Sequence, residues 1–202
     1  MEYLAIVGVF GFIIAVVVWA IKFTKRMNER KQNLFKDFAD RKGLSHSSEK
    51  RFLHTLNTID GTLNNCHFQI TEKIIGSGKN QQVMADVKFY NSPINFDFRI
   101  SKEHLLTKVG KKFGLQDIEI GNDEFDNLFL LKSESENQMR DLINYDIQIE
   151  LRNIVKEMSG SLIQKDEVFS YSVPGGLINE KAFKATERII DVMIKMMNVR
   201  RR

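Results

Sequence analysis

The hydrophobic positions of this chain begin with a single uninterrupted block. Residues 4–21, LAIVGVFGFIIAVVVWAI, are about 18 apolar residues in a row, without a charged side chain or a proline. A helix of that length is close to what the hydrocarbon core of a bilayer requires. A cleaved signal peptide would begin with positive charge and end in small residues, and a buried core helix would show a polar face. This segment has none of these features. We therefore predict a transmembrane helix over residues 1–22.

The next block keeps a helical period but becomes polar. Met27, Leu34, Phe35 and Phe38 recur at the spacing of one helix face, and Gly43 is a suitable stop. We predict a juxtamembrane stalk helix over residues 23–43 whose C-terminal half packs on the following domain. An amphipathic helix lying in the membrane interface is the alternative.

Beyond residue 44 the period changes from helix to strand. Ser48 is a plausible cap for a short helix through Leu56. Apolar residues then alternate with polar ones in residues 62–75, 83–90 and 94–100, and short polar links separate these stretches. This pattern predicts three consecutive strands in an antiparallel meander.

The second half of the chain mixes short strands with helices. Ser133 and Glu136 have the spacing of a capping box and precede a long apolar stripe through residue 158. The remaining expected elements are a short helix over 105–113 capped by Ser101, a strand at 118–120, a strand or buried turn at 125–131, one or two strands in 162–173, and a last helix capped by Asn179.

The predicted order of elements does not alternate strictly between strand and helix. A parallel doubly wound sheet is therefore not expected. We predict an α+β fold: an N-terminal transmembrane helix followed by an antiparallel sheet, packed on one face by two long helices. Residues 44–202 would form one α+β domain.

The net charge of +4 is concentrated beside the predicted span. Residues 22–42 hold eight Lys or Arg against three acidic residues, and no Lys or Arg precedes the span. The positive-inside rule then places the N-terminus outside and the domain in the cytoplasm, at a bacterial-type inner membrane. Residues 43–199 are slightly acidic, which argues against nucleic-acid binding, and the basic segment suits anionic lipid headgroups. The single cysteine, Cys66, agrees with a reducing compartment.

Motifs that would carry chemistry are incomplete. Residues 76–79, GSGK, lack the spacing and the Ser/Thr of a phosphate-binding loop, so we expect a hairpin turn. The histidines His46, His54, His67 and His104 show no zinc spacing. Cys66 and His67 are neighbours and would point to opposite faces of a strand. The sequence predicts no catalytic, cofactor-binding or metal-binding residue.

The segment with the densest polar chemistry is residues 120–129, IGNDEFDNLF. Its carboxylates Asp123, Glu124 and Asp126 could bind a cation, but the alternating acids of an EF-hand are absent. We expect instead a solvated turn in which Phe125 and Phe129 enter the core and Asp126 caps local backbone N–H groups.

The same segment carries a resemblance. The pattern FD-x-x-F, from Phe125 to Phe129, followed by LKSESE and a helical stretch, resembles a region of uncharacterised bacterial membrane-anchored proteins. The similarity extends over residues 61–176 in order and spacing. It implies a short membrane segment before an α+β domain and no catalytic residues. Some of these proteins have two spans, whereas this chain has one.

Taken together, these patterns favour a binding protein. We expect the domain to bind a protein partner or a ligand at the inner membrane surface, with residues 4–21 in the lipid bilayer. One alternative is a membrane-associated metal-dependent hydrolase that uses Asp123, Glu124 and Asp126 together with His67 or His104. Another is a structural subunit of a membrane assembly.

Overall fold

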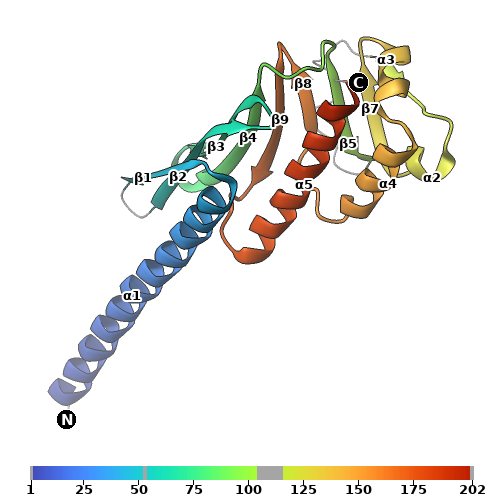
Figure 1. Ribbon diagram of the computed structural model, residues 1–202. Helices are drawn as coiled ribbons and strands as arrows, with labels where there is room; N and C mark the ends of the chain where they lie inside the picture. The colour runs from blue at the N-terminus through green and yellow to red at the C-terminus, as the bar shows by residue number, and fades with distance from the viewer. Residues whose placement is uncertain (1, 52–53, 104–115, 201–202) are drawn as a thin grey trace.

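The described part of the chain is one long helix leading into an antiparallel sheet. The computed structural model describes residues 2–51, 54–103 and 116–200, and within these the strands form one nine-stranded sheet of order β1-β2-β3-β4-β9-β8-β5-β7-β6 (Figure 1). The strands are β1 (Ser45–Arg51), β2 (His54–Leu63), β3 (Cys66–Ile75), β4 (Gln82–Tyr90), β5 (Phe98–Lys102), β6 (Gln116–Ile118), β7 (Phe129–Ser133), β8 (Leu162–Lys165) and β9 (Val168–Pro174). The helices are α1 (Glu2–Lys42), α2 (Asp123–Asp126), α3 (Glu136–Leu142), α4 (Tyr145–Ile154) and α5 (Glu180–Val199).

Tight hairpins connect several neighbouring strands. Asn64 and Asn65 join β2 to β3 with φ of 53° and 55°, and Asp166 and Glu167 join β8 to β9 with φ of 48° and 62°. Two successive residues of positive φ make the turn whose twist matches paired strands. The GSGK segment lies in the β3–β4 hairpin around a short 3₁₀ turn at Gly78–Asn80, which confirms the predicted loop.

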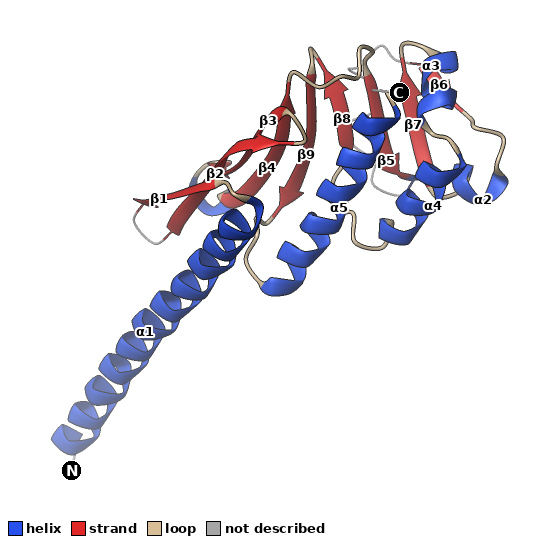
Figure 2. Cartoon of the chain, viewed as in Figure 1, coloured by secondary structure: helices blue, strands red, loops and turns tan. Residues whose placement is uncertain are grey.

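The sheet has a core face and a polar face. On β3, Cys66, Phe68 and Ile70 are buried, whereas His67 and Gln69 point to the other side. Helices α4 and α5 and the C-terminal end of α1 lie on the core face (Figure 2). The predicted α+β class with an antiparallel sheet is therefore confirmed.

Of the two long helices predicted to pack on the sheet, the one that ends at residue 158 is not a single long helix. The stripe from Met139 to Met158 is buried as expected, but the helix that carries it is interrupted between α3 and α4. The backbone leaves helical geometry at Ile143, where φ is −88° and ψ is 53°. Asn144 then begins α4 by accepting a hydrogen bond from the backbone N–H of Ile147 at 3.1 Å. The apolar residues are therefore buried at the predicted positions although the helix is broken, because Asn144 caps the start of a new helix after the break.

Several strand predictions also needed correction. Where a helix was expected from Ser48 to Leu56, the described residues belong to β1 and β2, and all of β1 pairs with residues 54–60 of β2. The third strand begins at Phe98, not residue 94, and pairs with β7 and β8, so it does not follow β4 in a meander. Ile94 and Phe96 are buried without belonging to a strand. The alternation of apolar and polar residues correctly indicated which side chains are buried there. A side chain can be buried without its backbone pairing with another strand.

The capping box predicted at Ser133 and Glu136 does not form. Ser133 lies in β7, where its hydroxyl donates to the carbonyl oxygen of Asp97 at 3.2 Å, and Ser135 is the residue that precedes α3. Ser101 lies in β5. The helix expected at 105–113 lies outside the described residues.

Helix α1 joins the predicted span and stalk in one continuous element (Figure 1). Among the residues that were described, no helix has the length and apolar character needed to cross a membrane. Much of the predicted span, residues 4–11 and 13, lies outside the side chains that the structure describes. The transmembrane assignment stays a prediction.

The two phenylalanines of the acidic segment are core residues, as expected. Phe125 and Phe129 are buried and their ring centroids lie 4.9 Å apart. We predict that Phe125→Ala lowers the free energy of unfolding by about 3–5 kcal/mol, because a large buried ring leaves a cavity.

Thermal or urea unfolding of the full chain in a mild detergent measures this change. Leu128→Ala is the matched control, because Leu128 is partly exposed beside the same turn. Equal effects of the two substitutions would contradict the burial of Phe125.

Candidate functional site

Apolar side chains are exposed along the N-terminal half of α1. Phe12 is 70% exposed and Trp19 is 66% exposed, and residues 14–23 between and around them are exposed as well. Successive helix residues point in directions about 100° apart, so this consecutive run leaves every side of the helix uncovered. The helix extends away from the domain at this point (Figure 1). An apolar surface of this kind marks a membrane or protein interaction site.

A group of cations follows the apolar stretch. Lys22, Lys25, Arg26 and Arg30 are exposed on the helix between the apolar run and the domain. Lys31 differs, because its side chain is only 9% exposed and turns into the domain. The change from exposed to buried cations marks where α1 meets the sheet.

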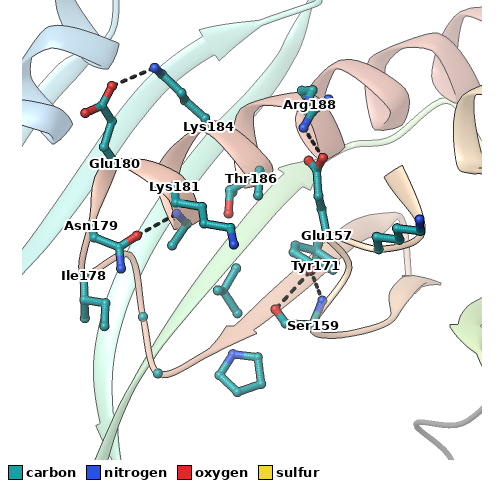
Figure 3. Close-up of a pocket in the computed structure, with 17 residues that line it drawn as sticks. Glu157, Ser159, Tyr171, Ile178, Asn179, Glu180, Lys181, Lys184, Thr186 and Arg188 are labelled. Atoms are coloured by element: carbon teal, nitrogen blue, oxygen red, sulfur yellow. Dashed lines mark hydrogen bonds and ion pairs between the residues drawn. The ribbon is translucent and has the colours of Figure 1, made fainter. Parts of the chain in front are cut away.

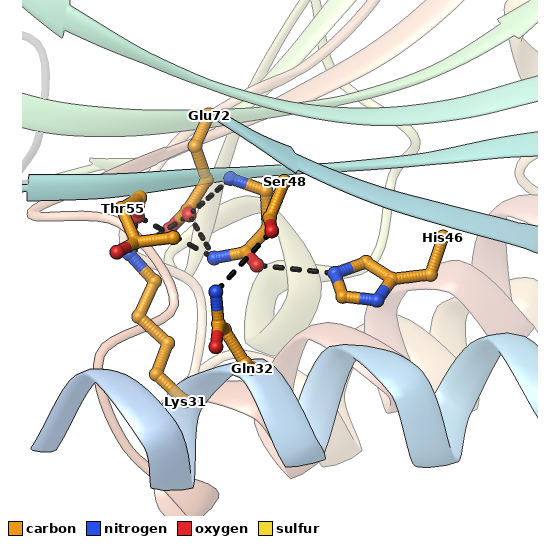
Figure 4. A network of polar contacts seen from close by, with 7 residues as sticks. Lys31, Gln32, His46, Ser48, Thr55 and Glu72 are labelled. Atoms are coloured by element: carbon orange, nitrogen blue, oxygen red, sulfur yellow. Dashed lines mark hydrogen bonds and ion pairs between the residues drawn. The ribbon is translucent and has the colours of Figure 1, made fainter. Parts of the chain in front are cut away.

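A buried polar network holds α1 on the sheet (Figure 4). The Lys31 Nζ lies 2.8 Å from Oε2 of Glu72, whose side chain is fully buried, and it donates to the carbonyl oxygen of Thr55 at 3.0 Å. Asn57 donates to the same Glu72 oxygen through its backbone N–H at 3.0 Å and through Nδ2 at 2.9 Å. His46 Nε2 lies 3.1 Å from Oδ1 of Asn57. Three donors on one carboxylate oxygen compensate the burial of its charge.

Aromatic contacts and ion pairs set the direction of α1 relative to α5. Phe35 and Phe38 both pack on Phe183, with ring centroids 5.2 and 5.6 Å apart. One turn further along each helix, Arg41 pairs with Glu187 at 2.7 Å. Since later residues of α1 meet later residues of α5, the two helices run in the same sense. The N-terminus of α5 therefore faces the side from which α1 leaves the domain.

A cavity of about 870 Å³ lies at that end of α5 (Figure 3). The first two turns of α5 form one wall and the segment after α4 forms another, while the end of β9 and the loop after it supply apolar surface. Its polar lining includes Lys156, Glu157, Tyr171, Lys181, Lys184, Thr186 and Arg188.

The ionic groups of the cavity are unevenly paired. Glu157 contacts Arg188, and Glu180 lies 2.6 Å from Lys184. The hydrogen bond and the positive charge of Lys184 lower the pKa of the Glu180 carboxyl. Lys156 and Lys181 contact no carboxylate within 4.0 Å among the residues described. The cavity therefore has an excess of positive charge.

The Tyr171 hydroxyl closes the inner end of the cavity. It accepts hydrogen bonds from the backbone N–H groups of Ser159, at 2.8 Å, and Gly160, at 3.3 Å. These contacts hold the segment after α4 against β9. The cavity wall is thus rigidly attached to the sheet.

The acidic segment is organised for structure. Asp126 accepts from the backbone N–H groups of Ile120, Gly121 and Asn122 at 2.9–3.1 Å, which confirms its predicted capping role. Glu124 pairs with Arg152 at 2.6 Å. Asp123 lines a separate, largely acidic cavity of about 770 Å³. Among the described residues, no group of three His, Cys, Asp or Glu side chains is placed to hold a metal ion.

The structure does not bring His67 to this segment. His67 lies on β3 and its Nε2 lies 2.9 Å from Oδ2 of Asp60; this hydrogen bond lowers the pKa of the Asp60 carboxyl. Five strand spacings separate β3 from β7, or roughly 24 Å at about 4.8 Å each. His104 lies outside the described residues. Cys66 is buried on the opposite face from His67, as predicted.

Sequence reasoning did not find the α5 cavity. Lys156 and Lys181 are 25 positions apart, and no motif links them. One signal was present: Thr186 is a polar residue on the otherwise apolar stripe of α5. Comparison of the chain with models of protein families, with curated proteins and with solved structures found no match.

The buried pair between Lys31 and Glu72 predicts a specific stability pattern. Lys31→Met should lower the free energy of unfolding by about 3–5 kcal/mol, because Glu72 is left as an unpaired buried charge. The double variant Lys31→Met/Glu72→Met should recover most of this loss, since apolar replacements of buried pairs are often neutral. Urea unfolding of the full chain in detergent measures both.

Lys25→Met is the matched control. Lys25 and Glu29 are exposed partners on the same helix at 3.9 Å, so their loss should change stability by less than about 0.5 kcal/mol. A Lys31→Met variant as stable as this control would refute the proposed role of the network.

Proposed function

We propose that this protein is a single-pass membrane protein whose α+β domain binds a partner or ligand at the membrane surface. Residues 4–21 would form the span, and the domain would lie in the cytoplasm at the inner membrane of a bacterial-type cell. The observation that carries the proposal is the group of exposed apolar side chains on α1, which includes Phe12, Trp19 and Phe23. These side chains project from the domain with no described element covering them.

Three further features support membrane insertion over packing against another protein. The run in residues 4–21 is apolar on every side, whereas a helix that docks on a protein needs one apolar face. Exposed cations follow at once, at the depth where anionic headgroups attract them. Trp19 and Phe23 stack at 5.5 Å near this boundary, and tryptophan favours the headgroup level.

The binding role rests on how firmly the domain is held. Lys31 is about ten helix residues from Ile21, or roughly 15 Å. The domain would therefore lie close to the headgroups and keep one side towards them, because the buried network fixes α1 on the sheet. That arrangement suits recognition of something at the membrane surface.

Alkaline extraction tests the anchor. The full chain should stay in the membrane fraction after washing with alkaline carbonate, which removes peripheral proteins. The double substitution Val16→Asp/Val17→Asp should release it, since an aspartate near a span's centre costs about 2.5–3.5 kcal/mol.

Asn33→Asp/Asn153→Asp adds the same two charges at exposed positions and should leave membrane retention unchanged. Complete removal of the wild-type chain by carbonate would overturn the proposed span.

Reporter fusions test the orientation. A reporter fused after Arg202 should be active if it works in the cytoplasm and inactive if it works only in the periplasm, because the cations lie on the C-terminal side of the span. Activity of the periplasmic reporter would reverse the topology.

A further inference from the structure

We propose that the cavity at the N-terminus of α5 binds a phosphate ester that also carries hydroxyl groups. The ligand class follows from three properties of the cavity, each judged on the described residues: lysines without a carboxylate partner, a hydroxyl that opens to the cavity without a hydrogen bond, and a buried carboxylate oxygen without a donor. The soluble form of this chemistry is a polyol phosphate, and the membrane form is a glycerophosphate headgroup.

The positive charge comes from side chains and from the helix. Lys156 and Lys181 border the cavity without a carboxylate partner among the described residues. Helix α5 is 20 residues long, and its N-terminal N–H groups add partial positive charge at the same place. Asn179 caps the N–H of Ala182, and the preceding N–H groups of that first turn have no carbonyl partner within the helix. This combination favours a phosphate group.

The hydroxyl group that opens to the cavity is that of Thr186. This residue is only 3% exposed and lines the cavity, and its hydroxyl has no hydrogen-bond partner among the described residues. Figure 3 shows its oxygen directed towards the space lined by Lys181 and Tyr171. Because the rest of this side chain is buried and no described group bonds to its hydroxyl, the hydroxyl can find a partner only in the cavity, where a ligand oxygen can take that place.

The buried carboxylate narrows the ligand further. One oxygen of Glu157 contacts Arg188, and the other, Oε2, is buried without a hydrogen-bond partner. A carboxylate accepts hydrogen bonds and repels a bare anion. A ligand hydroxyl can donate to it once the Glu157 side chain turns towards the cavity, because this oxygen has almost no accessible surface in the structure. Val173 and Pro174 give an apolar wall for the carbon skeleton.

The position of the cavity is compatible with a lipid source. The N-terminus of α5 faces the side from which α1 leaves, and it lies level with about residue 32 of α1. The distance to Ile21 along the helix is roughly 16 Å, and a common span tilt of about 20° brings one side of the domain closer to the headgroups. Binding of a lipid headgroup rests on the proposed membrane anchor, whereas binding of a soluble polyol phosphate does not.

Binding is measured on the full chain in a neutral detergent, by calorimetry and by the melting temperature with added glycerol 3-phosphate or inorganic phosphate. Glycerol 3-phosphate should bind more tightly than inorganic phosphate and raise the melting temperature. Lys156→Gln/Lys181→Gln should raise its Kd at least roughly tenfold, the usual weight of lost charge-assisted hydrogen bonds. Lys36→Gln/Lys50→Gln removes the same charge from exposed positions elsewhere and should bind as the wild type does.

Thr186→Val separates binding from folding. Valine has the same shape without the hydroxyl, so this variant should be as stable as the wild type or more stable, while its Kd for glycerol 3-phosphate rises severalfold. A variant that binds as tightly as the wild type would exclude Thr186 from the site and overturn the proposal.

Nanodiscs of phosphatidylglycerol or phosphatidylcholine distinguish the two sources. If glycerol 3-phosphate has no effect, the headgroup is supported by a melting temperature that is higher in phosphatidylglycerol than in phosphatidylcholine. This increase should be lost in Lys156→Gln/Lys181→Gln and kept in Lys36→Gln/Lys50→Gln. If neither form stabilises the chain, or if both lysine pairs behave alike, the site does not exist. Retention of the chain in carbonate-washed membranes is scored separately, so a failed anchor and a failed cavity give different results.

Discussion

The buried contact between α1 and the sheet is the constraint on which the rest of this molecule depends. Lys31 reaches Glu72 across the core boundary, and Asn57 supplies two further donors to the same oxygen. A buried ion pair adds little net stability compared with apolar packing, but it tolerates few alternative arrangements. Together with Phe35 and Phe38 it fixes both the rotation and the height of α1 on the domain.

In the proposed membrane-anchored arrangement, that constraint would decide which side of the domain faces the bilayer. Because α1 and α5 run in the same sense, the exposed apolar run and the α5 cavity lie towards the same end of the molecule. A flexible tether would let the domain turn any side to the bilayer. A rigid helix would turn one fixed side towards the bilayer, and Lys156 and Lys181, which pair with no carboxylate among the described residues, lie towards that side.

The acidic segment shows how a conspicuous sequence feature can be structural. Its carboxylates suggested a cation site, yet Asp126 is used by three backbone N–H groups and Glu124 by Arg152. Phe125 and Phe129 anchor the turn in the core. The α5 cavity, by contrast, is lined by residues with no shared motif, because only the fold brings Lys156 and Lys181 to the same cavity.

The sequence by itself determined the local features: the long N-terminal helix pattern, the alternation of β3 and β4, the buried stripe of residues 139–158, and the Asn179 cap of α5. These depend on the spacing of apolar residues and on side chains a few positions away. The tertiary structure alone decided that β4 pairs with β9, that β5 lies between β7 and β8, and that Thr186 faces a cavity. Strand partners and cavities are set by contacts between distant segments, and hydrophobic periodicity is the same whichever partner a strand finds.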